Sequence, residues 1–272
     1  MTPAEDTLRL DAFTTEHIDD AARLSRQVAW PHRAEDWALT LSQSRGVVAI
    51  AGDAVVGTAL VSVFGDVALL SMIIVDETQR GKRIGRRLME AIIAMAEGQQ
   101  MRLVATRDGL PLYEKLGFRA TGDIRQHQGI AVAAEPEIPV SQGAGDPAML
   151  AAMDVAASGL RRDGLLARLC AQGTVFGCDG GFAIMRDFGR GKVLGPIVAT
   201  DLPRARALLA AAAQNHAGEF LRIDTPCAEL GQYAETLGLA HAGGGTAMSV
   251  GGAARNEDRG YRTYGLVSQA LG

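Results

Sequence analysis

The chain has 272 residues, enough for one large domain or two of ordinary size, because domains most often hold about 100 to 150 residues. Hydrophobic residues make up 47% of the sequence and charged residues 21%, which supports packed cores and excludes general disorder. The formal net charge of -4, with the signs interspersed, excludes an attraction of the whole protein to nucleic acid or to an anionic membrane.

Targeting and metal-binding patterns are not evident in the sequence. The N-terminus lacks a basic segment followed by an apolar run, so we expect no signal peptide. No apolar run reaches the roughly 18 residues that cross a bilayer. Cys170, Cys178 and Cys227 lack the paired spacing of a zinc or redox site, so we expect buried, reduced thiols and no metal. These features predict a cytoplasmic protein with neither a membrane nor a nucleic-acid partner.

Apolar periodicity divides the first half of the chain into helices and strands. The run Val67 to Val75 is almost entirely apolar, as a central strand covered on both faces requires. Beyond it, Leu88, Ile92 and Met95 recur at helical spacing. We expect, in chain order, an edge strand around Leu8 to Phe13, helices at 15–27 and 34–42, strands at 47–50, 55–63 and 67–75, a helix from Ile84 to about Gly98, a strand at 103–105, a helix at 110–116 and a strand from Phe118.

The second half repeats this order in diverged form. Gln128 to Asp146 is rich in proline and glycine and is typical of a linker with room for one strand. After it we expect helices at 147–157 and 163–171, strands at 174–176, 181–185 and 193–198, a helix at 202–214, a strand at 220–223, a helix ending near Leu237 and a closing strand at 264–267. Leu237-Gly238-Leu239 takes the place of Leu116-Gly117-Phe118. The connection that follows the strand at 193–198 is shorter than the one that follows the strand at 67–75 in the first half.

The segment Arg80 to Arg86 lies between the central strand and the start of the amphipathic helix. Four amides at a helix N-terminus have no partner within the helix, and the macrodipole adds roughly half a positive charge there. Gly81 and Gly85 let a ligand approach the backbone, and the basic side chains add positive charge. The pattern therefore predicts a phosphate-binding loop, although it also fits solvated basic residues at an exposed turn. The chain lacks the Gly-Lys-Ser/Thr of a P-loop, and a meander precedes this loop, unlike a Rossmann fingerprint.

Two motifs resemble the signatures of the GNAT superfamily of N-acetyltransferases. The segment Ile73 to Leu88 resembles its acetyl-CoA motif, Gln/Arg-x-x-Gly-x-Gly/Ala, and Leu112 to Phe118 resembles its second signature at the usual separation. The expected strand order also matches that fold, and the resemblance covers residues 5 to 130. The second half resembles the degenerate C-terminal domain of tandem GNAT proteins.

The resemblance implies acetyl-CoA as a co-substrate. Its pantetheine arm would pair with the backbone of Ile73, Ile74 and Val75, as an added strand does. Its pyrophosphate would lie in the loop formed by Arg80, Gly81, Lys82, Arg83, Ile84, Gly85 and Arg86. Arg83 departs from the motif because it stands where the family has its middle glycine. There it either narrows the room for the pyrophosphate or binds phosphate through its guanidinium.

Acetyl transfer to an amine needs a polarised carbonyl, a base and an acid. The resemblance implies that Tyr113 is the acid; a ring that only packs on its helix is the alternative. No base is evident, because the strand Val67 to Val75 carries no carboxylate where family members often have a glutamate. Trp30, His32 and Ser71 are candidates for the acceptor site, although tryptophan as a core anchor and histidine as a structural residue are open alternatives.

The sequence thus predicts an α/β (α+β) protein with two tandem GNAT-like domains, each a mixed, mostly antiparallel central sheet flanked by helices. We expect a catalytic acetyl-CoA-binding domain at 1–130, a linker at 131–145 and a degenerate domain at 146–272. The predicted reaction is acetyl transfer to a primary amine of a small molecule or peptide by direct attack. A non-catalytic acyl-CoA-binding or sensing protein and a structural protein with a vestigial loop are the alternatives, and a homodimer is left open.

Overall fold

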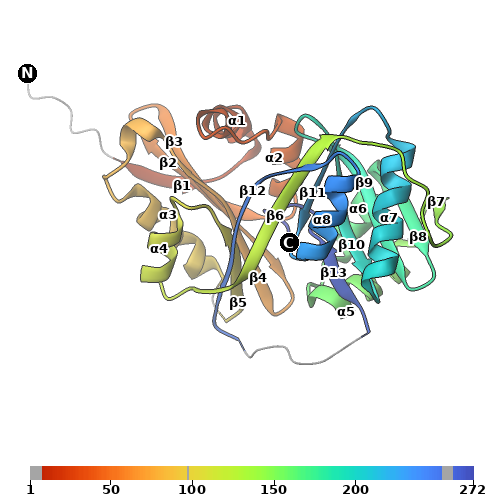
Figure 1. The fold of residues 1–272 in the computed structure, drawn as a ribbon. Helices are drawn as coiled ribbons and strands as arrows, with labels where there is room; N and C mark the ends of the chain where they lie inside the picture. The colour runs from red at the N-terminus through yellow and green to blue at the C-terminus, as the bar shows by residue number, and fades with distance from the viewer. Residues whose placement is uncertain (1–7, 97, 253–259) are drawn as a thin grey trace, which may run out of the picture. The chain divides into compact units, whose positions relative to one another are not determined.

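A computed structural model describes residues 8–96, 98–252 and 260–272. Contacts divide the chain into two compact units, Met1–Leu103 and Val104–Gly272 (Figure 1). Across the described residues, every helix falls short of the length and apolarity that crossing a bilayer takes.

The first unit is a mixed sheet covered by helices. Its strands follow one another in the order β1 (Arg9–Ala12), β2 (Arg45–Ala51), β3 (Ala54–Phe64), β4 (Val67–Val75) and β5 (Gln100–Ala105), the last running across the boundary. Among the described pairings within this unit, only that of β4 with β5 is parallel. The helices are η1 (Thr15–His17), α1 (Ile18–Gln27), α2 (Ala34–Leu41), η2 (Glu77–Gln79) and α3 (Ile84–Met95). The apolar strand β4 therefore has strand neighbours on both sides, as its composition predicts.

The two faces of the first sheet can be told apart on β3. A Cβ built on Gly57 would lie 2.9 Å from Leu88 of α3, whereas the hydroxyl of Ser62 lies 2.6 Å from that of Ser44, just after α2. Because side chains alternate along a strand, α3 covers one face while α1 and α2 cover the other. On that second face Trp37 is fully buried.

The second unit is also a mixed, mostly antiparallel sheet. Its strands are ordered β12 (Ala240–Val250), β6 (Arg119–Ile130), β11 (Phe220–Thr225), β10 (Gly191–Ala199), β9 (Gly181–Phe188), β8 (Thr174–Cys178) and β7 (Ser141–Gly143), and β13 (Arg262–Gly265) pairs with β10. The helices are α4 (Leu110–Lys115), α5 (Pro147–Ser158), α6 (Asp163–Gln172), α7 (Leu202–Asn215) and α8 (Ala228–Thr236). In the described part of this unit only β10 and β11 pair in parallel, as β4 and β5 do in the first unit.

An internal repeat is visible at two helix ends. After α4, Gly117 has φ 88° and the amide of Phe118 donates to the carbonyl of Tyr113 at 3.0 Å. After α8, Gly238 has φ 83° and the amide of Leu239 donates to the carbonyl of Ala234, also at 3.0 Å. Both ends need the left-handed glycine for this reversal. The order of helices and strands around them repeats as well, as the sequence predicts.

Most expected elements are confirmed, and one strand was missed. β12 contains the run Gly243 to Gly245, which has low strand propensity, and its pairing with β6 shifts register twice. One further detail differs: the closing strand, β13, spans Arg262–Gly265 rather than 264–267. The three cysteines are free thiols, as expected, but they are half-buried rather than buried.

Candidate active site

A bulge lies near the middle of β4. The register with β3 shifts so that Ala59 faces Met72 and Ile73 together. Met72 has φ 54°, in the left-handed region that non-glycine residues rarely adopt. The hydroxyl of Thr58 donates to the carbonyl of Met72 at 2.7 Å and holds this conformation. Bulges redirect a strand and interrupt its pairing, and they are common beside active sites.

Beyond the bulge, β4 is paired on one side only. Its parallel ladder with β5 covers Val67, Ala68 and Leu69, while Ile74 and Val75 still pair with β3. Within the described residues, the edge of β4 that faces β5 therefore has no strand partner from the bulge onward. An open edge of this kind can accept an extended ligand by backbone pairing.

The loop after β4 presents unsatisfied amides. From Gly81 to Arg86, no backbone amide donates a hydrogen bond to another residue in the described part of the chain. Gly81 has φ 83°, and a Cβ added to it would meet no atom within 4 Å. Arg83, the N-cap of α3, has φ 60° and ψ 17°, the left-handed conformation, and makes no side-chain cap. A glycine, which the resembled motif has at this position, would adopt this positive φ without strain.

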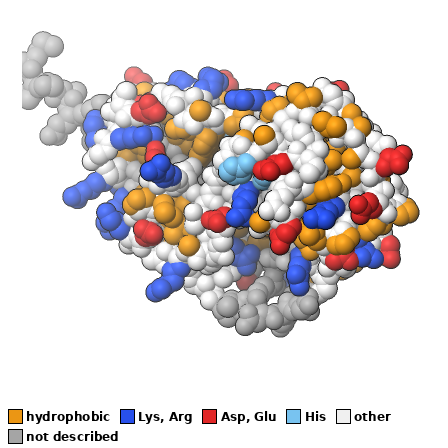
Figure 2. Space-filling view, in the orientation of Figure 1, with side chains coloured by type: hydrophobic (Ala, Val, Ile, Leu, Met, Phe, Trp, Pro, Cys, Tyr) orange, Lys and Arg blue, Asp and Glu red, His pale blue; other side chains and the backbone are white. Residues whose placement is uncertain are grey.

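The basic side chains of the loop differ in their partners. Lys82 donates to Gln79 at 2.6 Å, Arg86 pairs with Glu90 at 2.8 Å, and Arg80 lies 4.0 Å from Glu77. Among the described residues, no partner contacts the exposed guanidinium of Arg83. Figure 2 shows several Lys and Arg side chains at the surface of the first unit near α3.

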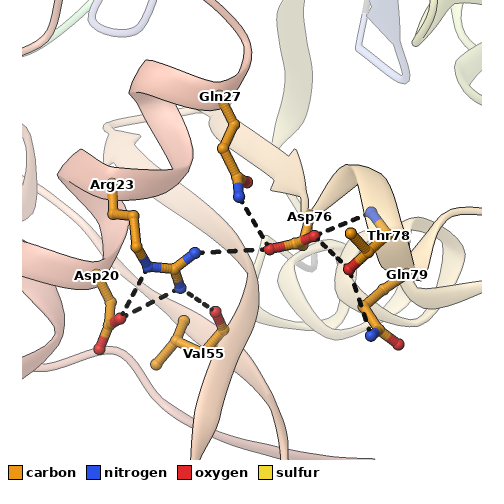
Figure 3. Close-up of polar contacts among 7 residues, drawn as sticks. All are labelled: Asp20, Arg23, Gln27, Val55, Asp76, Thr78 and Gln79. Carbon is orange, nitrogen blue, oxygen red and sulfur yellow. Dashed lines mark hydrogen bonds and ion pairs between the residues drawn. The ribbon is translucent and has the colours of Figure 1, made fainter.

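A buried carboxylate, which the sequence analysis missed, holds the start of this loop. Asp76 follows β4 directly and is 8% exposed. It accepts hydrogen bonds from Thr78 and from Gln27 and lies 3.5 Å from a nitrogen of Arg23 (Figure 3). The hydrogen bond from the Thr78 hydroxyl is the main reason that the pKa of Asp76 lies below its usual value. Two sequence patterns could have indicated this carboxylate. One is Asp-x-Thr after a strand, and the other is the i, i+4 spacing that places Arg23 and Gln27 on one helix face.

Tyr113 lies on α4 in the second unit. Its ring packs edge-on against Phe118 at 6.3 Å, and a Cβ on Gly109 would lie only 2.8 Å from it. Only 6% of the residue is exposed, and burial raises the pKa of its phenol to about 12. The phenol is therefore a proton donor, not a phenolate, at neutral pH.

The three acceptor-site candidates lie on the α1–α2 face of the first sheet. Ser71 pairs with Leu60, which shares the face of Ser62, and its buried hydroxyl has no hydrogen-bond partner among the described residues. Trp30 and His32, half-buried, lie between α1 and α2 with ring centroids 5.7 Å apart. Trp37, by contrast, is a core anchor that stacks on Phe13.

The second half of the chain lacks both the loop and the tyrosine at the repeated positions. Only Thr200 and Asp201 separate β10 from α7, and the Asp201 carboxylate caps α7 by accepting from the amide of Arg204 at 3.0 Å. A helix N-terminus that already holds a carboxylate offers little to a phosphate. At the repeated helix end, Ala234 stands where Tyr113 stands in the first half.

A cavity in the second unit has none of the predicted site residues in its lining. Its volume is about 840 Å³, and it is lined by β7, the start of α5 and the β8–β9 turn. Within the described residues, no three His, Cys, Asp or Glu side chains are grouped to bind a metal ion.

Comparisons with known proteins agree on one family. Two models described as an acetyltransferase (GNAT) domain match residues 12–134 and 150–265. The uncharacterized N-acetyltransferase YitH of Bacillus subtilis is 34% identical over 116 residues, a match that spans only 41% of each chain.

Solved structures share the fold at low sequence identity. A putative acetyltransferase from Pyrococcus horikoshii has a TM-score of 0.83 at 20% identity and covers 97% of this chain and 96% of its own. A GCN5-related N-acetyltransferase from Sphaerobacter thermophilus has a TM-score of 0.61 at 15% identity, covering 89% and 95%.

Proposed function

The chain belongs to the GNAT superfamily of acetyltransferases, with two tandem GNAT domains, and from this premise we propose that it is an acetyl-CoA-dependent N-acetyltransferase. GNAT enzymes use acetyl-CoA as their co-substrate. The proposed acceptor is a primary amine of a small molecule or a peptide. The domain limits 1–130, 131–145 and 146–272 remain predictions, whereas the family models match residues 12–134 and 150–265.

The observation that carries the proposal is the loop from Gly81 to Arg86. Its amides are unsatisfied, it opens α3, and it follows a strand whose edge is open. Pyrophosphate oxygens would accept hydrogen bonds from these amides, with Arg80, Lys82 and Arg86 adding charge. The pantetheine arm would pair with Ile73, Ile74 and Val75.

The proposed reaction is a direct transfer. The neutral amine attacks the thioester carbonyl carbon, a C–N bond forms and the C–S bond breaks. The departing sulfur takes a proton from the Tyr113 phenol, and the nitrogen loses one to water. Tyr113 receives this role from the sequence motif; burial keeps its phenol protonated at neutral pH and also makes it a weaker acid than an exposed tyrosine.

We propose one active site per chain. Asp201 and Ala234 replace the phosphate loop and the tyrosine in the second half, which supports a non-catalytic role for that domain.

One observation favours a second candidate, a non-catalytic acyl-CoA sensor. β4 carries no carboxylate, and Ser71 is its one polar residue, so a side-chain base is missing from this strand. Without such a base the enzyme must rely on an already neutral amine or on water to take the proton. Binding of acetyl-CoA without thiol release across a broad amine panel would favour the sensor.

Calorimetric titration of acetyl-CoA into wild type and into Gly85→Glu tests the site. The substitution places bulk and negative charge where the pyrophosphate would lie, so we expect affinity to fall at least about tenfold. Gly164→Glu makes the same change at an exposed position of α6, where an added Cβ meets no atom within 4 Å, and is the matched control. Equal affinity of wild type and Gly85→Glu would refute the proposed loop.

A further inference from the structure

The two oxygens of the Asp76 carboxylate serve different elements. Oδ1 accepts from the amide of Thr78 at 2.9 Å and from its hydroxyl at 2.7 Å, on the side of the loop. Oδ2 accepts from Nε2 of Gln27 at 3.2 Å and lies 3.5 Å from Nη1 of Arg23, both on α1. One carboxylate therefore joins α1 to the turn that leads into the loop (Figure 3).

The surroundings of Asp76 are themselves anchored. Its amide donates to the carbonyl of Val56 at 2.8 Å, and its carbonyl accepts from the amide of Gln79 at 2.9 Å. Arg23 also donates to the carbonyl of Val55 at 2.7 Å. The link from α1 is thus also hydrogen-bonded to the backbone of β3.

The backbone amides of the loop do not hold its shape. Its amides from Gly81 to Arg86 make no hydrogen bonds within the described residues, and Arg83 keeps a left-handed conformation that costs an L-residue energy. Its geometry is therefore imposed by α3, in which Ile84 is buried, and by the η2 turn on the other side. At the η2 end, Asp76 is the buried polar group.

We propose that Asp76 is a positioning residue that fixes the phosphate-binding loop to α1 and so sets the affinity for the pyrophosphate of acetyl-CoA. This rests on the proposed function, because it concerns the same loop. Asp76 touches no substrate and acts through Thr78. It does so by holding the donors of residues 81–86 in place before the ligand arrives.

Asp76→Asn separates the two links. An asparagine can still accept from Thr78 through its oxygen, but its NH2 group faces Arg23, which can only donate, and Gln27, which must turn its amide over to accept. We expect coenzyme A to bind about tenfold more weakly, as when a charged hydrogen-bond partner is lost. Gln27→Ala removes a single neutral donor from α1 and leaves the turn intact, so a loss of about threefold is expected.

Comparison with pantetheine distinguishes a positioning role from a merely structural one, because loss of structure would weaken the binding of both ligands. Pantetheine shares the thiol arm of coenzyme A but lacks the pyrophosphate and the nucleotide. Affinities for both ligands are measured for each variant, by calorimetry for coenzyme A and by saturation-transfer NMR for pantetheine. Asp53→Asn makes the same chemical change at an exposed turn of the first unit and is the matched control.

The ratio of the two affinities decides the outcome. We expect the preference for coenzyme A over pantetheine to fall about tenfold in Asp76→Asn, to fall less in Gln27→Ala, and to be unchanged in Asp53→Asn. An unchanged ratio in Asp76→Asn and in Gln27→Ala, with a wild type that binds coenzyme A, would overturn the positioning role alone. A wild type that does not bind coenzyme A would overturn the proposed function as well.

Discussion

Replacing Arg83 by glycine should stabilise the first unit. Arg83 has φ 60°, a conformation that costs an L-residue about 1 to 2 kcal/mol relative to glycine. Glycine gives back part of that gain, about 0.4 to 1 kcal/mol, because it leaves the unfolded chain more freedom. The expected net difference is about 1 kcal/mol in favour of glycine.

The backbone effect is best isolated by comparing two variants that both lack the guanidinium. Arg83→Ala keeps the left-handed strain and Arg83→Gly relieves it, so Arg83→Gly should be the more stable by about 1 kcal/mol. The same pair at Glu90, inside α3, should show the opposite sign, because glycine in a helix is about 1 kcal/mol less stable than alanine.

Urea unfolding followed by tryptophan fluorescence is a suitable assay. Both tryptophans of the chain, Trp30 and Trp37, lie in the first unit, so the signal reports on the unit that carries the substitutions. Denaturation midpoints at a common slope give the difference in unfolding free energy. If Arg83→Gly is less stable than Arg83→Ala, the left-handed conformation at this position is wrong.

Two further predictions concern the chemistry and the number of sites. Tyr113→Phe should lower turnover more than acetyl-CoA affinity, and a turnover number equal to that of the wild type would remove the acid role. Because burial raises the pKa of Tyr113 to about 12, the wild-type rate should show no loss from deprotonation of Tyr113 between pH 6 and about pH 10. Calorimetry should give one acetyl-CoA per chain, since Asp201 caps α7 with its own carboxylate; two equivalents would contradict the assignment of the second half as degenerate.

Strong local patterns made the fold readable from the sequence. The apolar run of β4, the helical spacing in α3 and the glycines after α4 and α8 each specify one local structure. β12 could not be found in the same way, because its glycine run has no strand propensity and its pairing with β6 depends on tertiary context.

The sequence predicted only those parts of the candidate site that belong to a sequence motif. The sequence located the loop. It did not show that Arg83, which stands where the resembled motif has its middle glycine, adopts a positive φ. The Asp76 link joins residues 49 positions apart, Gln27 and Asp76, and no local periodicity encodes such a contact. The bulge at Met72 is likewise a property of the pairing of two strands.

The central claim is that this chain transfers acetyl groups to an amine. The most direct measurement incubates the full chain with acetyl-CoA and a panel of primary amines, and follows free thiol together with the acetylated product by mass spectrometry. We predict thiol release that matches amide formation for at least one amine class and that is lost in Gly85→Glu. Saturable acetyl-CoA binding with no thiol release and no acetylated amine across the panel would contradict the claim and favour a sensor.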